Sequence, residues 1–222
     1  TFLMDATYPR LLATPPHAAY LKIAEGCSNH CSYCIIPSIR GLYRSRKMDD
    51  ILCEAEQLAE KGVKELILIA QETTAYGFDL TGKPSLTNLV KKITDIKTIS
   101  WIRILYTYSF NITDQFLKMM ADEEKVCKYI DMPVQHIDDT ILQAMRRKDT
   151  SLGIRETIIK ARHMVPDVAL RTSLIVGFPG ETRLQFAKLR DFVEESRFDH
   201  LGVFTYSREE STVAAGFTNQ VS

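Results

Sequence analysis

The chain has 222 residues, 45% of them hydrophobic and 25% charged, a composition typical of a globular domain with a sizeable core. Its 28 basic and 28 acidic residues balance, which argues against a broad nucleic-acid-binding face because phosphate binding relies on clustered positive charge. There is no apolar run of the roughly 18 residues that a membrane span needs and no secretory signal, so we expect a cytoplasmic protein without a membrane partner.

The first residues, with Pro9, Pro15 and Pro16, predict a connector with little core of its own, which we place at residues 1–13. Six short apolar runs follow it. Their near-continuous hydrophobicity predicts strands of a parallel sheet that is buried under helices. These strands are expected at residues 19–25, 65–70, 101–107, 128–134, 169–178 and 200–207.

Helical patterns separate several of these runs, at residues 49–62, 85–96, 150–164 and 181–196. Asp49 is a candidate N-cap and Gly62 a candidate terminator of the first, and Thr150 or Ser151 caps the third. Strands that alternate with helices predict right-handed crossovers, and six units predict an α/β fold in the form of a partial (βα)6 TIM-like barrel. Chemistry in such a fold lies at the carboxyl ends of the strands.

Three of the five cysteines, Cys27, Cys31 and Cys34, directly follow the first strand. An odd cysteine count with this crowding disfavours a disulfide framework, and thiolates at this spacing can bind one iron–sulfur cluster. Zinc, or three thiols that merely pack in a loop, is the alternative. Three thiolates leave one iron of a cubane cluster open, which is where a substrate or cofactor binds. Cys53 and Cys127 are interpreted as core or bystander thiols.

Five segments carry a resemblance to the radical S-adenosylmethionine (SAM) methylthiotransferases, from about residue 14 to residue 212. They are "AYLKIAEGCSNHCSYCIIPSIRGLYRSR", "AQETTAYG", "YIDMPVQH", "RTSLIVGFPGET" and "HLGVFTYSREES". The resemblance implies a radical SAM core domain at residues 14–222, with a 4Fe-4S cluster on the three cysteines and SAM on the open iron. Reduction by a donor such as a flavodoxin or ferredoxin then yields a 5′-deoxyadenosyl radical.

Within the family, the chain is similar to the branch that adds a methylthio group to the β carbon of an aspartate in a small-subunit ribosomal protein. The tRNA-modifying branch is the alternative, although we do not expect nucleic acid as the direct target. A non-catalytic iron–sulfur electron carrier is a further alternative. The family also implies an N-terminal domain with a second 4Fe-4S cluster and a C-terminal TRAM domain, neither of which this sequence contains. Ser211, where the family usually has Gly, and residues 108–114 depart from its pattern.

The resemblance also assigns roles at the strand ends, and each role has a structural alternative. Glycines of the segment after the fifth strand would lie along the SAM adenosine, or form a tight turn. An Arg in that strand would bind the SAM carboxylate, or form an ion pair. No side chain is expected to act as an acid or base catalyst. The expected cofactor-binding residues are Glu72, Gln135, Arg171, Ser173, Gly177 and Gly180.

Other polar residues each have two interpretations from the sequence. His136 could contact SAM or substrate, or simply form a turn. Arg44 and Arg46 could guide an acidic partner, or lie on a solvated face. His17, His163 and His200 show no ligand spacing.

Overall fold

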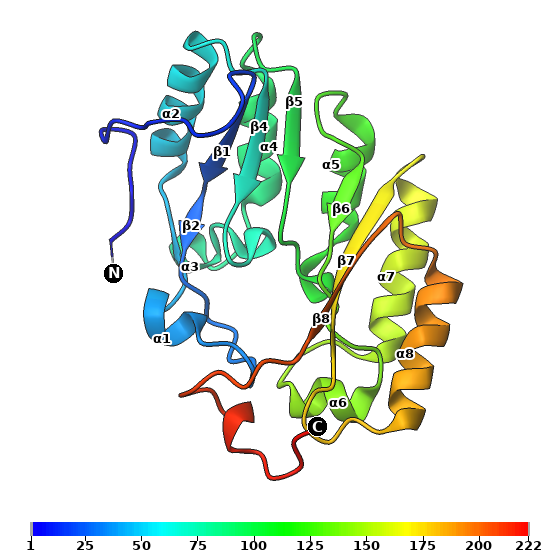
Figure 1. The fold of residues 1–222 in the computed structure, drawn as a ribbon. Coiled ribbons are helices and arrows are strands. Elements are labelled where there is room, and N and C mark those ends of the chain that lie inside the picture. The colour runs from blue at the N-terminus through cyan, green and yellow to red at the C-terminus, as the bar shows by residue number, and fades with distance from the viewer. Residues whose placement is uncertain (1, 222) are drawn as a thin grey trace.

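Two three-stranded parallel sheets form the centre of the computed structural model, which describes residues 2–221 (Figure 1). The sheets have the strand orders β1-β4-β5 and β6-β7-β8. A parallel bridge links Ile102 of the first sheet to Val126, which lies just before the first strand of the second sheet, so the expected partial barrel of parallel strands is confirmed. The strands are β1 (Ala18–Lys22), β4 (Glu65–Ile69), β5 (Trp101–Ile104), β6 (Tyr129–Asp131), β7 (Ala169–Val176) and β8 (His200–Thr205).

The first predicted strand, 19–25, is divided in two. After β1 the chain continues as β2 (Ala24–Glu25), which pairs antiparallel with β3 (Arg44–Ser45). This short pair closes the base of the segment that contains the three cysteines and α1 (Ile36–Arg40). The segment therefore projects from the carboxyl end of β1 while both of its ends are held.

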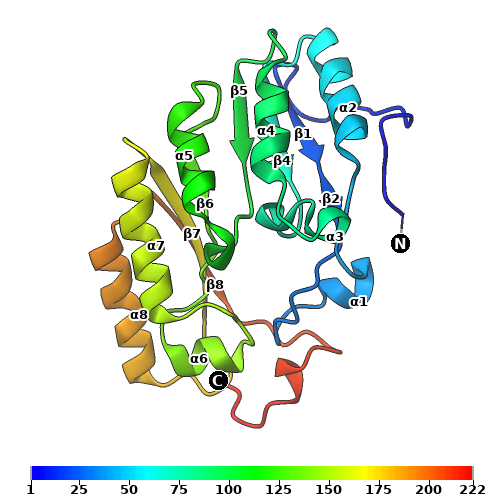
Figure 2. The same ribbon diagram turned by 180° about the vertical axis from the view of Figure 1, so that it is seen from behind.

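Helices cover the outer side of the strands, as both views show (Figures 1 and 2). The predicted helix 150–164 begins after the Thr150 cap as expected, whereas Asp49 is not an N-cap. Lys47 occupies that position without a side-chain cap bond, and Asp49 lies in the first turn, where its charge favours the helix dipole. The long helices are α2 (Met48–Glu60), α4 (Leu86–Thr94), α5 (Asp114–Asp122), α7 (Ser151–Met164) and α8 (Arg183–Ser196).

Shorter helices occupy the carboxyl side of the barrel. The predicted departure at residues 108–114 forms a 3-10 turn, and α5 directly after it had not been identified from the sequence. These elements are α3 (Phe78–Thr81), α6 (Asp139–Ala144), η1 (Thr73–Ala75), η2 (Ser109–Asn111) and η3 (Ala214–Gly216).

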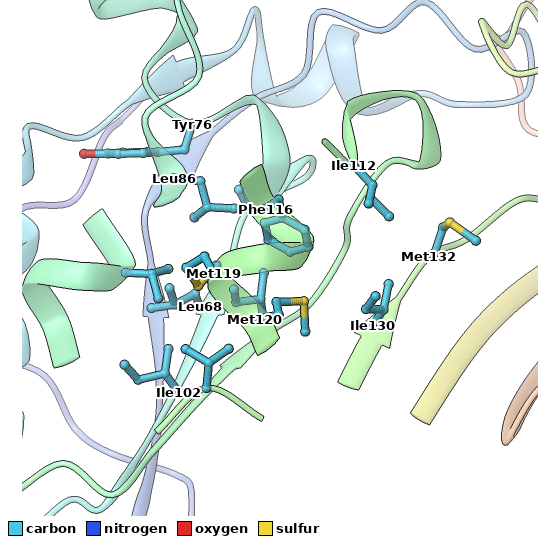
Figure 3. Packing of buried hydrophobic residues seen from close by; sticks show 14 of the residues in the cluster. Leu68, Tyr76, Leu86, Ile102, Ile112, Phe116, Met119, Met120, Ile130 and Met132 are labelled. Carbon is cyan, nitrogen blue, oxygen red and sulfur yellow. The ribbon is translucent and has the colours of Figure 1, made fainter. Parts of the chain in front are cut away.

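One continuous apolar core lies between the strands and the outer helices. Phe116, Met119 and Met120 of α5 pack there near Leu68 of β4 and Ile102 of β5 (Figure 3). Burial of such side chains is worth about 1.5–3 kcal/mol each, so this layer stabilises the strand framework that positions the site.

The last strand departs from the prediction that all six are buried. Most of β8 is exposed, and Val203 retains 53% of its accessible surface. The reason is its position, because β8 is the edge strand and, among the described residues, pairs only with β7.

Within residues 2–221 no helix is long and apolar enough to cross a membrane.

Arg46 is neither a solvated residue nor a partner contact, because it is almost completely buried. Its guanidinium binds Asp50 at 2.7 Å and also pairs with Glu54, and it donates to the Lys22 carbonyl at 2.7 Å. Residues 2–13 contain no helix or strand, and Arg10 forms an ion pair with the same Glu54. The start of the chain is thereby attached to α2.

Candidate functional site

A cavity of about 560 Å³ lies at the carboxyl ends of the parallel strands. Its lining brings together most of the residues that the sequence singled out, although they are spread over 147 positions of the chain. Gly177 and Gly180 are not among the lining residues. The predicted residues that line it are Cys27, Cys31, Cys34, Glu72, Gln135, Arg171 and Ser173.

The cysteine segment is fixed at its beginning by Gly26. This residue has φ of +80°, and a Cβ there would lie 2.3 Å from the Leu42 carbonyl oxygen, so the backbone needs glycine. Cys27 next to it donates its N–H to the Gly41 carbonyl at 3.1 Å. The two ends of the segment are thus packed directly against each other.

Its middle is attached to the other half of the barrel through Ser32. The Ser32 hydroxyl donates to the Ala144 carbonyl at 2.7 Å, and its N–H donates to the Met145 carbonyl at 3.0 Å. The Ala214 N–H donates to the Ser32 carbonyl at 2.8 Å. The thiols are therefore held between α6 and the C-terminal segment, above the strand ends.

Hydrogen-bond donors and a cation surround the thiols. The Asn29 N–H donates to Cys27 Sγ at 3.4 Å, and Arg147 lies near Cys31, where its charge lowers the pKa of a thiol that burial raises. Burial raises the pKa of Cys27 to about 11. A thiol in such a place is neutral unless a metal binds it, and donors aimed at sulfur are what an iron–sulfur site requires.

The three thiols fit a cluster better than a single ion. Within residues 2–221, no three His, Cys, Asp or Glu side chains are arranged to hold one metal ion. Cys27, Cys31 and Cys34 all line one cavity, and cysteine thiolates are the usual protein ligands of iron–sulfur clusters. Cys53 is exposed on α2 and Cys127 precedes β6, and neither lines the cavity.

Glu72 forms one wall of the cavity and links two loops. Its carboxylate accepts hydrogen bonds from Asn29 of the cysteine segment and from Asn111 of η2. Burial raises the pKa of Glu72 despite these two bonds. It stands at the N-cap position of η1 but makes no side-chain cap bond there. Its predicted contact with SAM stays a prediction.

Two non-glycine residues that line the cavity have left-handed backbones. They are Gln135, with φ of +69°, and Tyr106, with φ of +58°. Gln135 is held there by strand-like bonds, since its N–H donates to the Ser173 carbonyl at 2.9 Å and its carbonyl accepts from Ile175 at 2.8 Å. Such conformations are uncommon and gather at functional sites.

The segment after β7 that contains Gly177 and Gly180, called the glycine segment below, is held by the buried side chain of Glu181. Glu181 accepts hydrogen bonds from the N–H groups of Gly177 and Phe178, and its other oxygen lies 3.4 Å from His136 Nε2. His136 is fully buried and accepts the Asp138 N–H on Nδ1, so its role here is structural. The close approach that Gly180 permits is to the Asn219 side chain, and the predicted adenosine contact stays a prediction.

Arg171 has the ion-pair partner that was one of its two alternatives. Its Nη1 donates to Asp131 Oδ1 at 2.7 Å, across neighbouring strands in register. Whether Arg171 also contacts SAM stays a prediction.

Sequence reasoning missed Arg147, whose guanidinium binds Asp149 and the Pro133 carbonyl and lies 3.3 Å from the Tyr33 hydroxyl. No local pattern marks Arg147, which follows a short helix 12 residues after Gln135.

The chain matches the family model described as the radical SAM superfamily over residues 21–193. It is 59% identical over 221 residues to a protein of Syntrophus aciditrophicus named ribosomal protein uS12 methylthiotransferase RimO. The proteins of that name from Pelotomaculum thermopropionicum and Clostridioides difficile are 54% and 50% identical. These alignments cover 99–100% of the chain and 49–50% of each relative, so the chain spans about half the length of the curated relatives it matches.

Solved structures share the fold at low sequence identity. The radical S-adenosylmethionine methyltransferase TsrM from Kitasatospora setae aligns with a TM-score of 0.73 and 16% identity, over 89% of this chain and 40% of that one. Methylornithine synthase aligns with a TM-score of 0.64 and 14% identity, over 92% of this chain and 57% of that one.

Proposed function

This chain belongs to the radical SAM superfamily, and from that premise we propose that it forms the catalytic core of a methylthiotransferase. The proposed reaction adds a methylthio group to the β carbon of an aspartate of ribosomal protein uS12. Support comes from curated relatives of that name at 50–59% identity along the whole chain. Because the chain spans half of their length, the complete activity and the substrate are proposals.

The observation that carries the proposal is the cavity itself. Three thiols line it together with Arg171, Gln135 and other polar side chains, and the remaining cysteines lie elsewhere. In our proposal, Cys27, Cys31 and Cys34 hold a 4Fe-4S cluster, and SAM completes its coordination. When bound, the cluster and SAM supply the electron transfer and the carbon-centred radical that remove a hydrogen atom from the substrate.

The protein's own part is to bind, orient and exclude water. Glu72 keeps the cysteine segment against η2, and the Glu181 contacts keep the glycine segment in shape. We assign SAM contacts to Glu72, Gln135 and Ser173 within the cavity and to the loop of Gly177 and Gly180 at its border. Gln135 is fixed in backbone conformation, so its amide needs no rearrangement of the main chain to meet a ligand.

Further parts of the proposal concern the surroundings of this core. We propose a cytoplasmic protein, with residues 1–13 as a connector to an N-terminal domain that carries a second 4Fe-4S cluster, and residues 14–222 as the radical SAM core. A flavodoxin or ferredoxin would supply the electron. The tRNA-modifying branch and a non-catalytic electron carrier are the competing functions. A carrier requires four protein ligands, and only three cysteines line this cavity.

The test begins with the cluster. The protein is reconstituted anaerobically with iron and sulfide, and 5′-deoxyadenosine released from SAM under dithionite is measured. Cys31→Ser should lose both the bound iron and SAM cleavage, whereas Cys53→Ser, which changes an exposed cysteine outside the cavity, should retain both. Equal behaviour of the two variants would contradict the assigned cluster site.

The substrate is tested separately with the full-length protein. Purified uS12 and a tRNA anticodon stem-loop are offered in parallel, and the mass increase of a methylthio group is measured on each. We expect modification of uS12 on an aspartate. Modification of the RNA alone would favour the tRNA branch, and SAM cleavage with neither substrate modified would reject both.

A further inference from the structure

A buried carboxylate, Asp131 at the end of β6, lies behind two residues that line the cavity, although it does not line the cavity itself. Asp131 is fully buried, and both of its oxygens accept hydrogen bonds. Oδ1 accepts from Arg171 Nη1 at 2.7 Å, and Oδ2 accepts from the Tyr106 N–H at 3.1 Å. A carboxylate without such partners would be costly to bury, so these bonds fix two cavity-lining residues to one immobile group.

Arg171 keeps N–H donors that no group within residues 2–221 accepts. A guanidinium has five N–H donors in a planar fork, and within residues 2–221 the contact of Arg171 is the one through Nη1. Its side chain retains 35% of its accessible surface and lines the cavity. The hydrogen bond from Arg171 to Asp131 raises the pKa of Arg171 although burial opposes it, so the charge persists. A fixed guanidinium with a free edge is suited to bind a carboxylate.

Arg147, the other arginine that lines the cavity, directs its guanidinium at groups of the protein. Arg147 is almost fully buried and binds both Asp149 and the Pro133 carbonyl, with its remaining nitrogen near the Tyr33 hydroxyl. Of the residues that line the cavity, Arg171 is therefore the cation with unused donors.

Tyr106 is the second cavity-lining residue that Asp131 holds in place. It is 48% exposed and lines the same cavity as Arg171. Its left-handed backbone is held by Asp131 on one side and by the Thr73 N–H, which donates to its carbonyl at 3.0 Å, on the other. Strained residues that the surrounding structure holds in place cluster at active sites and ligand-binding positions.

Arg171 is level with the end of β6 but lies well before the end of the longer β7. Arg171 is the third residue of β7 and Gly177 follows its last residue, so the two are six positions apart, about 20 Å along the extended strand. The cysteines follow the carboxyl end of the β1–β2 stretch, at the same edge of the barrel as Gly177. A carboxylate bound at Arg171 would therefore lie away from the glycine segment, to which the proposed function assigns a contact with SAM.

We infer that Arg171, fixed by Asp131 and flanked by Tyr106, binds the carboxylate of an acidic side chain of the substrate protein, rather than the carboxylate of SAM. The inference rests on the proposed function, in which the modified residue is an aspartate. Arg171 is then the residue that selects an acidic side chain over its neutral amide at the reacting position.

The test measures binding and needs no turnover. A fluorescent peptide with the target loop of uS12 is titrated into the reconstituted full-length protein, with Asp or with Asn at the modified position. A non-cleavable SAM analogue is titrated separately. The wild type should bind the Asp peptide at least tenfold more tightly than the Asn peptide. Arg171→Gln should remove that preference and leave the affinity for the SAM analogue within twofold.

Two further variants complete the test. Arg103→Gln is the matched control, because Arg103 is also a partly exposed strand arginine paired with a carboxylate, Glu65 at 2.6 Å, but does not line the cavity. It should change neither affinity. Arg171→Lys keeps the charge and the fold but lacks the planar fork, so it should restore part of the preference for Asp.

The possible failures are distinguishable. Loss of affinity for the SAM analogue in Arg171→Gln, with peptide preference unchanged, would assign Arg171 to SAM and overturn the inference. Wild-type affinities that are equal for the two peptides would also overturn it while leaving the substrate in place. Normal binding of the SAM analogue with no binding of either peptide would reject the proposed substrate, and the inference with it.

Discussion

Replacement of Gly26 by Ala should damage the cysteine segment more than the same change at another left-handed glycine. Both Gly26 and Gly62 have φ between +80° and +90°, where a side chain costs roughly 1–2 kcal/mol. At Gly62 nothing lies within 4 Å of the added Cβ, so Gly62→Ala should lose only about 1 kcal/mol of unfolding free energy. At Gly26 the Cβ would lie 2.3 Å from the Leu42 carbonyl oxygen and 2.6 Å from that of Gly41.

These neighbours are backbone atoms and cannot rotate away, so the segment itself must shift. Forced shifts of this kind cost about 1–3 kcal/mol more, which brings the expected loss for Gly26→Ala to about 2–5 kcal/mol. Urea denaturation of the metal-free protein gives the free energies, and iron retained per chain after reconstitution reports the geometry of the thiols. We expect lower iron content in Gly26→Ala alone. Equal stability and equal iron content in the two variants would refute the reasoning.

Three other predictions concern groups around the site. Arg46→Ala should lose about 3 kcal/mol in chemical denaturation because it strips a partner from buried carboxylates, whereas Lys47→Ala on the adjacent exposed residue should stay within about 0.5 kcal/mol. Partial burial opposes ionisation of Asp138, but hydrogen bonds from Lys188 and from the Gln185 amide hold its pKa below the usual range. The ionised Asp138 carboxylate therefore stabilises the fold in full above about pH 4, and this stabilisation is lost as the pH falls further. Thermal melts of Asp138→Asn should show a weaker dependence on acid pH than those of the wild type. Glu181→Gln should bind a SAM analogue about tenfold less tightly in calorimetry, since the segment after β7 loses charged acceptors; unchanged affinity would contradict that role.

The local parts of the site were predictable from the sequence. The spacing of Cys27, Cys31 and Cys34 directly after a strand indicates a shared ligand, because neighbours in sequence are neighbours in space. The strand runs were equally visible, since burial under helices requires continuous apolar residues. The cap at Thr150 follows from a short-range hydrogen bond that its side-chain oxygen accepts from the Gly153 N–H.

The long-range contacts were not predictable in the same way. Asp131 and Arg171 are 40 residues apart and meet only because β6 and β7 pair in one particular register. Arg46 stands in a basic run that suggests a surface, but the position of α2 brings two carboxylates to it and allows it to be buried. The exposure of β8 depends on its place at the sheet edge, which its own apolar sequence does not reveal.

The carboxylate of Glu54 has two arginine partners from different parts of the chain. Arg10 belongs to the segment that precedes the barrel, and Arg46 adjoins the strand that closes the base of the cysteine segment. Because both cations bind one buried anion, the free energy of each contact depends on the other, and a double-mutant cycle between them should be non-additive. The contact that holds the first residues is in this way thermodynamically linked to the contact beside β3, the strand at the base of the cysteine segment.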